Sequence, residues 1–286
     1  MDNLRTWLDK GDKSSERIPK LFPILIRQAQ LETPITYGDA ARELGIHHRA
    51  IHHIAGYIGL TLAEVATKKG WTYRPPPPLH SLIVNDITRL PGPGINGFMA
   101  ATYRNAATDD EKRAILKAVY SSARTYEAWE ELCDLLAISL KTETLAEAVE
   151  DARNSKGRGG EGKEHHALKM YIRDNPHVVG LLRGSPIGNV EYPTASGDRI
   201  DVVFNRRQLR LAVEVKSHRS SEGDMLRGVF QCLKYRVILE AEAALANENI
   251  AVVVRLVLGG TATPKVISVA NRLGVTIDDK LVFQIP

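Results

Sequence analysis

Glu214 and Lys216, an acid and a base, stand one residue apart at the end of an otherwise apolar stretch, LRLAVEVKSH. The alternating Leu211, Val213 and Val215 predict a strand that buries one face. Because side chains alternate along a strand, Glu214 and Lys216 share the opposite face. We expect this strand to be central, since a long helix and another buried strand follow it. Charges on a central strand are costly unless they are paired or hold a metal.

A second acid, Asp201, lies on the preceding predicted strand, RIDVVF. We expect the two strands to form a hairpin that turns at Arg206 and Arg207. In that register Asp201 faces Ala212 and is a diagonal neighbour of Glu214, at a backbone separation of roughly 7–8 Å. Two carboxylates this close repel each other unless a positive group lies between them, and a divalent cation with oxygen ligands is a common solution. The alternative is a solvated strand face with one Glu–Lys pair.

Helices before and after these strands carry further polar residues. Glu164 opens a predicted helix over residues 162–174. A long helix predicted over residues 224–245 carries Gln231 and Tyr235. These two side chains are four residues apart and lie on the same face of that helix. An aromatic residue on a buried helix face is usually part of the core, and we expect this of Tyr235.

This pattern resembles the PD-(D/E)xK nuclease superfamily, with its restriction-endonuclease-like fold, over about residues 160–286. The family has an acid on one strand, an acid-x-Lys on the next strand, and often a Glu on the preceding helix. Several of its branches also carry Gln-x-x-x-Tyr on the following helix. The matching residues are Asp201, Glu214-Val215-Lys216, Glu164 and Gln231-x-x-x-Tyr235.

The chain departs from the family pattern before the first acid, where no Pro is present and the sequence reads SGDRID. Asp198 and Asp201 are therefore both candidates for that acid. Only Asp201 shares a strand face with Glu214 in the expected register, so we assign the role to Asp201.

The resemblance implies a phosphodiesterase that depends on Mg²⁺ or Mn²⁺. Asp201, Glu214 and the carbonyl oxygen of Val215 would bind the metal, which would act as a Lewis acid and improve the nucleophile. Lys216 would orient or deprotonate the attacking water and help to stabilise charge on the phosphate.

Two further residues take supporting roles in this interpretation. Glu164 would be a further metal ligand through water, or it would hold Lys216. Gln231 would contact the substrate or the metal site.

The first part of the chain predicts a different kind of site. The segment YGDAARELGIHHRAIHHI is typical of a helix-turn-helix, with a glycine that permits a left-handed turn between its two helices. The second helix displays five residues that suit phosphate or base contacts in a major groove. They are His47, His48, Arg49, His52 and His53. The alternatives are a plain pair of packed helices, or a metal site at His48 and His52, for which no third ligand is evident.

With the later segment PPPPLHSLIVNDITRLPGPGINGF, residues 20–100 also resemble the winged-helix domain of alkyltransferase-like DNA-binding proteins. The Pro-Cys-His-Arg signature of the alkyltransferases is absent. This excludes alkyl transfer to a thiol at that place and leaves DNA binding as the implied role. Arg74, Asn85 and Arg89 are candidate DNA contacts, or else ordinary surface and loop residues.

Three regions are expected along the chain. Residues 15–105 are predicted to form a mainly α helix-turn-helix or winged-helix-like domain, residues 106–155 a helical connector, and residues 156–286 the nuclease domain. Antiparallel strands followed by β-α-β alternation predict an α/β fold in the last region, with a mixed central sheet flanked by helices.

Composition adds bounds of its own. The 286 residues carry a net charge of +4 and a pI near 9.0, which weakly favours an acidic partner such as nucleic acid. The sequence has no apolar run of membrane-spanning length and begins without the apolar segment of a secretory signal. Cys133 and Cys232 lack metal-ligand spacing, so we expect buried thiols in a reducing, cytoplasmic compartment.

The patterns together predict a Mg²⁺-dependent DNA endonuclease that acts in restriction or in defence against foreign DNA. A homodimer would suit double-stranded DNA, because a symmetric duplex favours a two-fold assembly. The alternatives are a catalytically silent DNA-binding protein with a nuclease-like fold, and an exonuclease or RNA-directed nuclease. The deep, narrow major groove of RNA disfavours reading by a helix.

Overall fold

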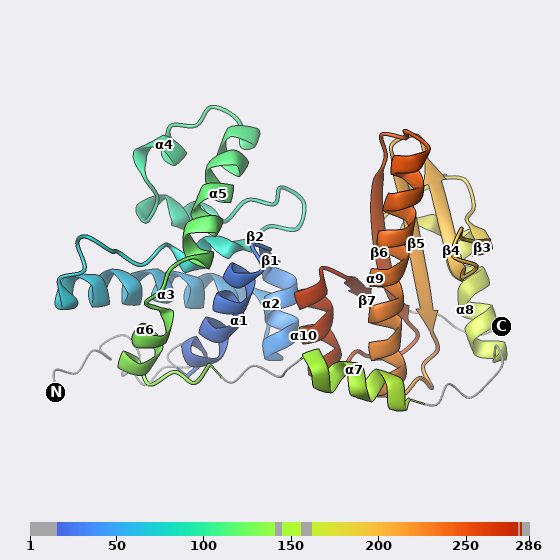
Figure 1. Cartoon of the computed structure of the whole chain (residues 1–286), viewed down its shortest axis with the longest axis horizontal. Coiled ribbons are helices and arrows are strands. Elements are labelled where there is room, and N and C mark those ends of the chain that lie inside the picture. The colour runs from blue at the N-terminus through green and yellow to red at the C-terminus, as the bar shows by residue number, and fades with distance from the viewer. Residues whose placement is uncertain (1–15, 141–144, 156–161, 280, 282–286) are drawn as a thin grey trace. The chain divides into compact units, whose positions relative to one another are not determined.

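The computed structural model describes residues 16–140, 145–155, 162–279 and 281 (Figure 1). The chain forms two compact units, residues 1–142 and 143–286. Each unit buries apolar side chains in an interior of its own.

The helices expected to form a separate connector over residues 106–155 are divided between the two units. α5 (Asp109–Arg124) and α6 (Trp129–Leu135) contribute their apolar faces to the core of the first unit. α7 (Leu145–Asn154) contributes its apolar face to the core of the second unit. The expected boundaries are corrected accordingly, because an amphipathic helix belongs to the core against which its apolar stripe packs.

The first unit is mainly helical. α1 (Ile18–Gln30) is joined to α2 (Tyr37–Leu44) by a buried ion pair, in which Arg27 Nη1 lies 2.6 Å from Glu43 Oε1. α3 (His48–Lys69) follows α2 directly. The short elements of this unit are η1 (Leu79–Leu82), η2 (Pro93–Gly97) and α4 (Ala101–Arg104).

The helix pair predicted near residues 37–54 is present as α2 and α3. Thr36 begins α2, because its hydroxyl accepts a hydrogen bond from the N–H of Asp39 at 3.0 Å. Gly45 ends α2 in the left-handed region, with a φ of 65°, as the turn between the helices was predicted to require.

The strands of the first unit are short. β1 (Ile35–Thr36) and β2 (Ile83–Val84) pair in parallel, and β2 lies in the segment SLIVND that was predicted to form a strand. A parallel pair is not an antiparallel hairpin, so in the described residues these two strands do not form a wing. The winged-helix assignment stays a prediction.

The second unit is built on a five-stranded mixed sheet in the order β3-β4-β5-β6-β7. β3 (Asn189–Pro193), β4 (Arg199–Arg206) and β5 (Leu209–Lys216) pair antiparallel, whereas β6 (Ala251–Leu258) and β7 (Thr276–Asp278) continue the sheet in parallel. The prediction of a mixed α/β sheet is confirmed. β5 is its central strand, as the apolar stretch indicated.

Helices cover both faces of this sheet (Figure 1). α8 (Lys163–Asp174) packs on the face that includes Val215. α9 (Glu222–Leu245) and α10 (Pro264–Leu273) pack on the opposite face, which includes Ala212. η3 (Pro176–Val179) follows α8. The crossover helices α9 and α10 connect the parallel strands, as parallel pairing requires.

The hairpin of β4 and β5 has a different register from the predicted one. Its two-residue loop is formed by Arg207 and Gln208, and Val202 pairs with Val213. Continuing this register by one residue places Asp201 directly opposite Glu214, closer than the expected diagonal arrangement. The correction follows because a hairpin loop commonly contains two residues, whereas the predicted turn left none between the strands. The shift is an even number, so both carboxylates stay on one face.

Candidate active site

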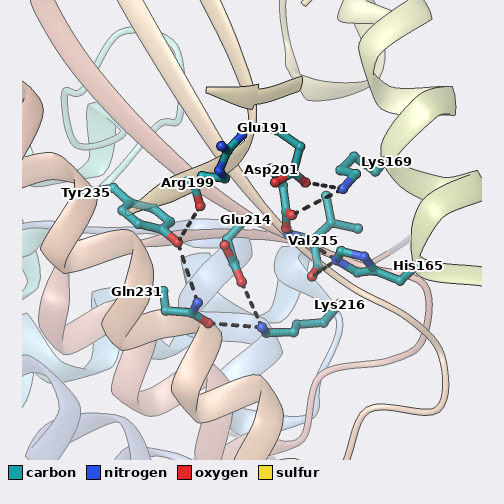
Figure 2. A network of polar contacts seen from close by, with 10 residues as sticks. All are labelled: His165, Lys169, Glu191, Arg199, Asp201, Glu214, Val215, Lys216, Gln231 and Tyr235. Carbon is teal, nitrogen blue, oxygen red and sulfur yellow. Dashed lines mark hydrogen bonds and ion pairs between the residues drawn. The ribbon is translucent and has the colours of Figure 1, made fainter. Parts of the chain in front are cut away.

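Two carboxylates meet on neighbouring strands at the centre of the second unit (Figure 2). Asp201 comes from β4 and Glu214 from β5. Glu214 is buried, with 4% of its surface exposed. Burial raises the pKa of Glu214 to about 7, and the negative charge of Asp201 raises it further, while Lys216 opposes the shift.

Lys216 lies at the end of β5 and is held by two acceptors. Its Nζ donates to Glu214 Oε1 at 2.7 Å and to Gln231 Oε1 at 3.0 Å. Gln231 projects from α9, so the ammonium group is fixed between the strand and the helix (Figure 2). Tyr235, one turn further along α9, is buried and donates from its hydroxyl to the Arg199 carbonyl at 3.2 Å. It packs, as expected.

His165, on α8, is a site residue that sequence reasoning missed. Its Nε2 lies 3.0 Å from the carbonyl oxygen of Val215 and 3.3 Å from Asp201 Oδ2. Both neighbours are oxygen atoms, and the carbonyl can only accept, so Nε2 donates in that contact. The hydrogen bond with Asp201 raises the pKa of His165. The signal was available in the letters EHH, where the histidine follows Glu164.

Lys169 and Glu191 also belong to this network and were not predicted. Lys169, on α8, is paired with Glu191 of β3 and lies 3.9 Å from Asp201 Oδ1 (Figure 2). Asp201 Oδ2, the other carboxylate oxygen, accepts the backbone N–H of Val215 at 2.8 Å. The two oxygens of Asp201 therefore face different partners.

Glu164 lies at the start of α8 but pairs with other cations than expected. Its Oε1 is 3.0 Å from Arg219 Nη2 and its Oε2 is 3.5 Å from His218 Nδ1. Both partners lie on the loop that follows β5. The expected role of holding Lys216 is therefore wrong, since Glu214 and Gln231 hold that ammonium.

Asp198, the other candidate for the first acid, lies outside the network. Its Oδ1 is 2.7 Å from Lys234 Nζ, and its Oδ2 accepts from Ser196 at 2.6 Å. These contacts lower the pKa of Asp198, the bond from Lys234 most. The choice of Asp201 over Asp198 agrees with the geometry.

The donors near Asp201 and Glu214 suit a hard divalent cation. The pair combines two carboxylates with the Val215 carbonyl, and oxygen donors of these kinds are what Mg²⁺ and Mn²⁺ take. The described residues hold no cluster of three or more His, Cys, Asp or Glu side chains already arranged around a metal position. The raised pKa of Glu214 reflects a buried negative charge that a cation would relieve.

The five predicted DNA contacts lie together at the start of α3 in the first unit. All five side chains, those of His47, His48, Arg49, His52 and His53, are exposed. His47 is the N-cap of α3, and the ring of His52 stacks on Tyr37 with centroids 4.1 Å apart. Burial lowers the pKa of His52, and the charges of His53 and His48 add to this. No described residue completes a metal site at His48 and His52.

The other three candidate contacts have structural partners. Arg74 lies over the Trp71 ring and pairs with Glu131 at 3.0 Å. Asn85 accepts backbone N–H bonds from the turn that follows it, and Arg89 lies within that turn with a φ of 55°. Their ordinary roles as surface and loop residues account for these contacts.

Comparison of the chain with protein-family models, curated proteins and solved structures finds no match. Among the described helices, none combines the length and the apolar character needed to cross a membrane. Cys133 and Cys232 are free and buried, as predicted. The chain is thus defined by its own features: a mainly helical unit, and a mixed α/β unit with a polar network on its central strands.

Proposed function

We propose that the chain is a metal-dependent nuclease that hydrolyses phosphodiester bonds in double-stranded DNA. One observation carries the proposal. Asp201 and Glu214 lie opposite each other on β4 and β5, and the ammonium group of Lys216 is bonded to Glu214 at the strand end. Two acids and a lysine in this order are also what the resemblance to the PD-(D/E)xK superfamily rests on, and with it the restriction-endonuclease-like fold.

Asp201, Glu214 and the Val215 carbonyl would hold the Mg²⁺ or Mn²⁺ ion. His165 would complete the set, because its Nε2 already contacts two of these three residues. Once bound, the ion supplies Lewis-acid chemistry at the phosphate and lowers the pKa of a coordinated water.

Lys216 would orient the attacking water with its fixed ammonium group. Gln231 supports this role, since its side-chain oxygen accepts from Lys216 Nζ and limits the rotation of a long, flexible side chain. The positive charge also meets the charge that grows on the phosphoryl oxygens. Glu164 is placed to position Arg219 beside the same strand end.

The DNA would be bound through the five exposed residues at the start of α3. Imidazole and guanidinium groups at the N-terminal end of a helix suit phosphate and base contacts in a major groove. A homodimer would cut both strands, and restriction or defence against foreign DNA is the biological setting that this combination of units favours.

The test is cleavage of a supercoiled plasmid by the full-length protein in Mg²⁺ or Mn²⁺. We expect nicked and linear products from the wild type and none from Asp201→Ala or in EDTA. Asp198→Ala is the matched control, because it removes the same kind of side chain on the same hairpin and should leave cutting intact. Products from a circular substrate distinguish an endonuclease from an exonuclease. Equal cutting by wild type and Asp201→Ala, or none by either, would remove the proposal.

A further inference from the structure

Three acidic side chains stand in one row across the three antiparallel strands. The β3–β4 register pairs Val190 with Val202 and Tyr192 with Ile200, which places Glu191 beside Asp201. The β4–β5 register places Glu214 on the other side of Asp201. The proposed metal set uses Asp201 and Glu214. Glu191 and Asp201 form a second pair of adjacent carboxylates, which could by its donor types take a second cation.

Lys169 already serves that second pair. Its ammonium group is paired with Glu191 and lies 3.9 Å from Asp201 Oδ1, on the side of Asp201 away from the Val215 N–H (Figure 2). Its side chain is buried, with 3% of its surface exposed. A buried ammonium persists when it is paired, and its neighbours here are two carboxylates.

The backbone of Glu191 is bent to make this contact. Its φ is 50°, in the left-handed region that residues with a side chain seldom adopt, and within a strand. Such conformations cluster at functional sites, where the surroundings hold them in place. The strain and the buried lysine point to the same arrangement of Glu191, Lys169 and Asp201.

We infer that Lys169 supplies the second positive charge of this site, so that the centre takes one divalent ion and not two. The inference rests on the proposed nuclease function, whose metal it counts. Lys169 acts as a positioning residue. Its charge directs Asp201 Oδ1 away from the metal side and leaves Oδ2, beside the Val215 carbonyl, as the oxygen available to the ion.

The test counts Mn²⁺ ions bound by the full-length protein, by electron paramagnetic resonance of the free ion and without DNA. We expect one ion per chain for the wild type and for Lys169→Arg, which keeps the charge. Lys169→Ala should bind two, because it leaves Glu191 and Asp201 facing each other without a cation. Lys169→Ala combined with Glu191→Gln should return to one.

Glu164→Gln is the matched control on the same helix and should leave the count at one. Two ions in the wild type, or no binding, would overturn the inference, as would a folded Lys169→Ala protein that binds only one. Circular dichroism checks folding, and if Lys169→Ala does not fold, the wild type and Lys169→Arg decide. A protein that binds one ion but cuts no DNA keeps the inference and removes the nuclease proposal. A protein that cuts DNA with two bound ions does the reverse.

Discussion

Glu214 is an acid whose negative form is opposed by burial and by the neighbouring Asp201, so that its pKa rises from 4.5 to about 7. The folded state therefore binds this proton more tightly than the unfolded state does. The resulting stability is fully present below about pH 4.5 and is lost as the pH rises through about 7. A shift of this size corresponds to at most on the order of 3 kcal/mol.

We therefore expect metal-free wild-type protein to lose stability relative to Glu214→Gln as the pH is raised. The glutamine has the same shape but no charge to desolvate. The measurement is the free energy of unfolding of both proteins in EDTA, from about pH 5 to about pH 8, where the acid titrates. Added Mn²⁺ should stabilise the wild type at the upper end and leave the variant nearly unchanged. A difference between the proteins that does not depend on pH would contradict the prediction.

Single residues also mark the limit of what the sequence could predict. Glu214 and Lys216 were recognisable because alternation along a strand fixes which side chains share a face. His165 and Lys169 were not, because their role depends on how α8 lies across the sheet. That packing is set by contacts between residues distant in the sequence, which no local spacing reports.

The helix α3 shows the same tight coupling between sequence and packing in the first unit. Gly59 lies on its buried face, where an added Cβ would stand 2.6 Å from His80 and 2.8 Å from Phe98. His80 is itself buried, and burial lowers its pKa to about 4, so it packs as a neutral ring. Alanine here would force these two rings to move.

We expect Gly59→Ala to destabilise the protein by about 1–3 kcal/mol, the usual cost of overpacking a core. Gly56→Ala is the control, since its Cβ would meet no atom within 4 Å. That change should stabilise the helix by about 0.5–1 kcal/mol, because alanine loses less backbone entropy than glycine. Urea unfolding of both variants gives the comparison, and equal effects would show that the close packing of Gly59 carries no weight.

The helices and strands were largely predictable because their apolar periodicity and end signals are local. Residues 162–174 and 209–216 were predicted within one residue of α8 and β5. The pairing of strands was less predictable. The two-residue loop at Arg207 and Gln208 shifted the register, and the parallel partner of β1 lies almost fifty residues away in β2.

At the scale of the whole molecule, the chain combines two units with different chemistry. The acids of the proposed metal site belong to residues 143–286, whereas the exposed His and Arg residues of α3 belong to residues 1–142. The overall charge of +4 is too small to distinguish a DNA-binding protein by itself. Where the charges lie is the stronger argument, and it predicts that DNA affinity and metal binding can be changed separately.

The helix α3 offers a test of that separation within one element. Arg49→Ala with His53→Ala removes two exposed basic side chains at its start, while Lys68→Ala with Lys69→Ala removes two exposed ones at its end. If DNA is bound at the start of α3, the first double variant should lower duplex affinity and reduce the slope of log affinity against log salt by about one, since each lost phosphate contact removes roughly one released counterion. The second should change neither. Fluorescence anisotropy at several salt concentrations measures both quantities, and Mn²⁺ binding should be the same in all three proteins. Equal losses of affinity in the two double variants would mean that net charge, and not the predicted recognition surface, holds the DNA.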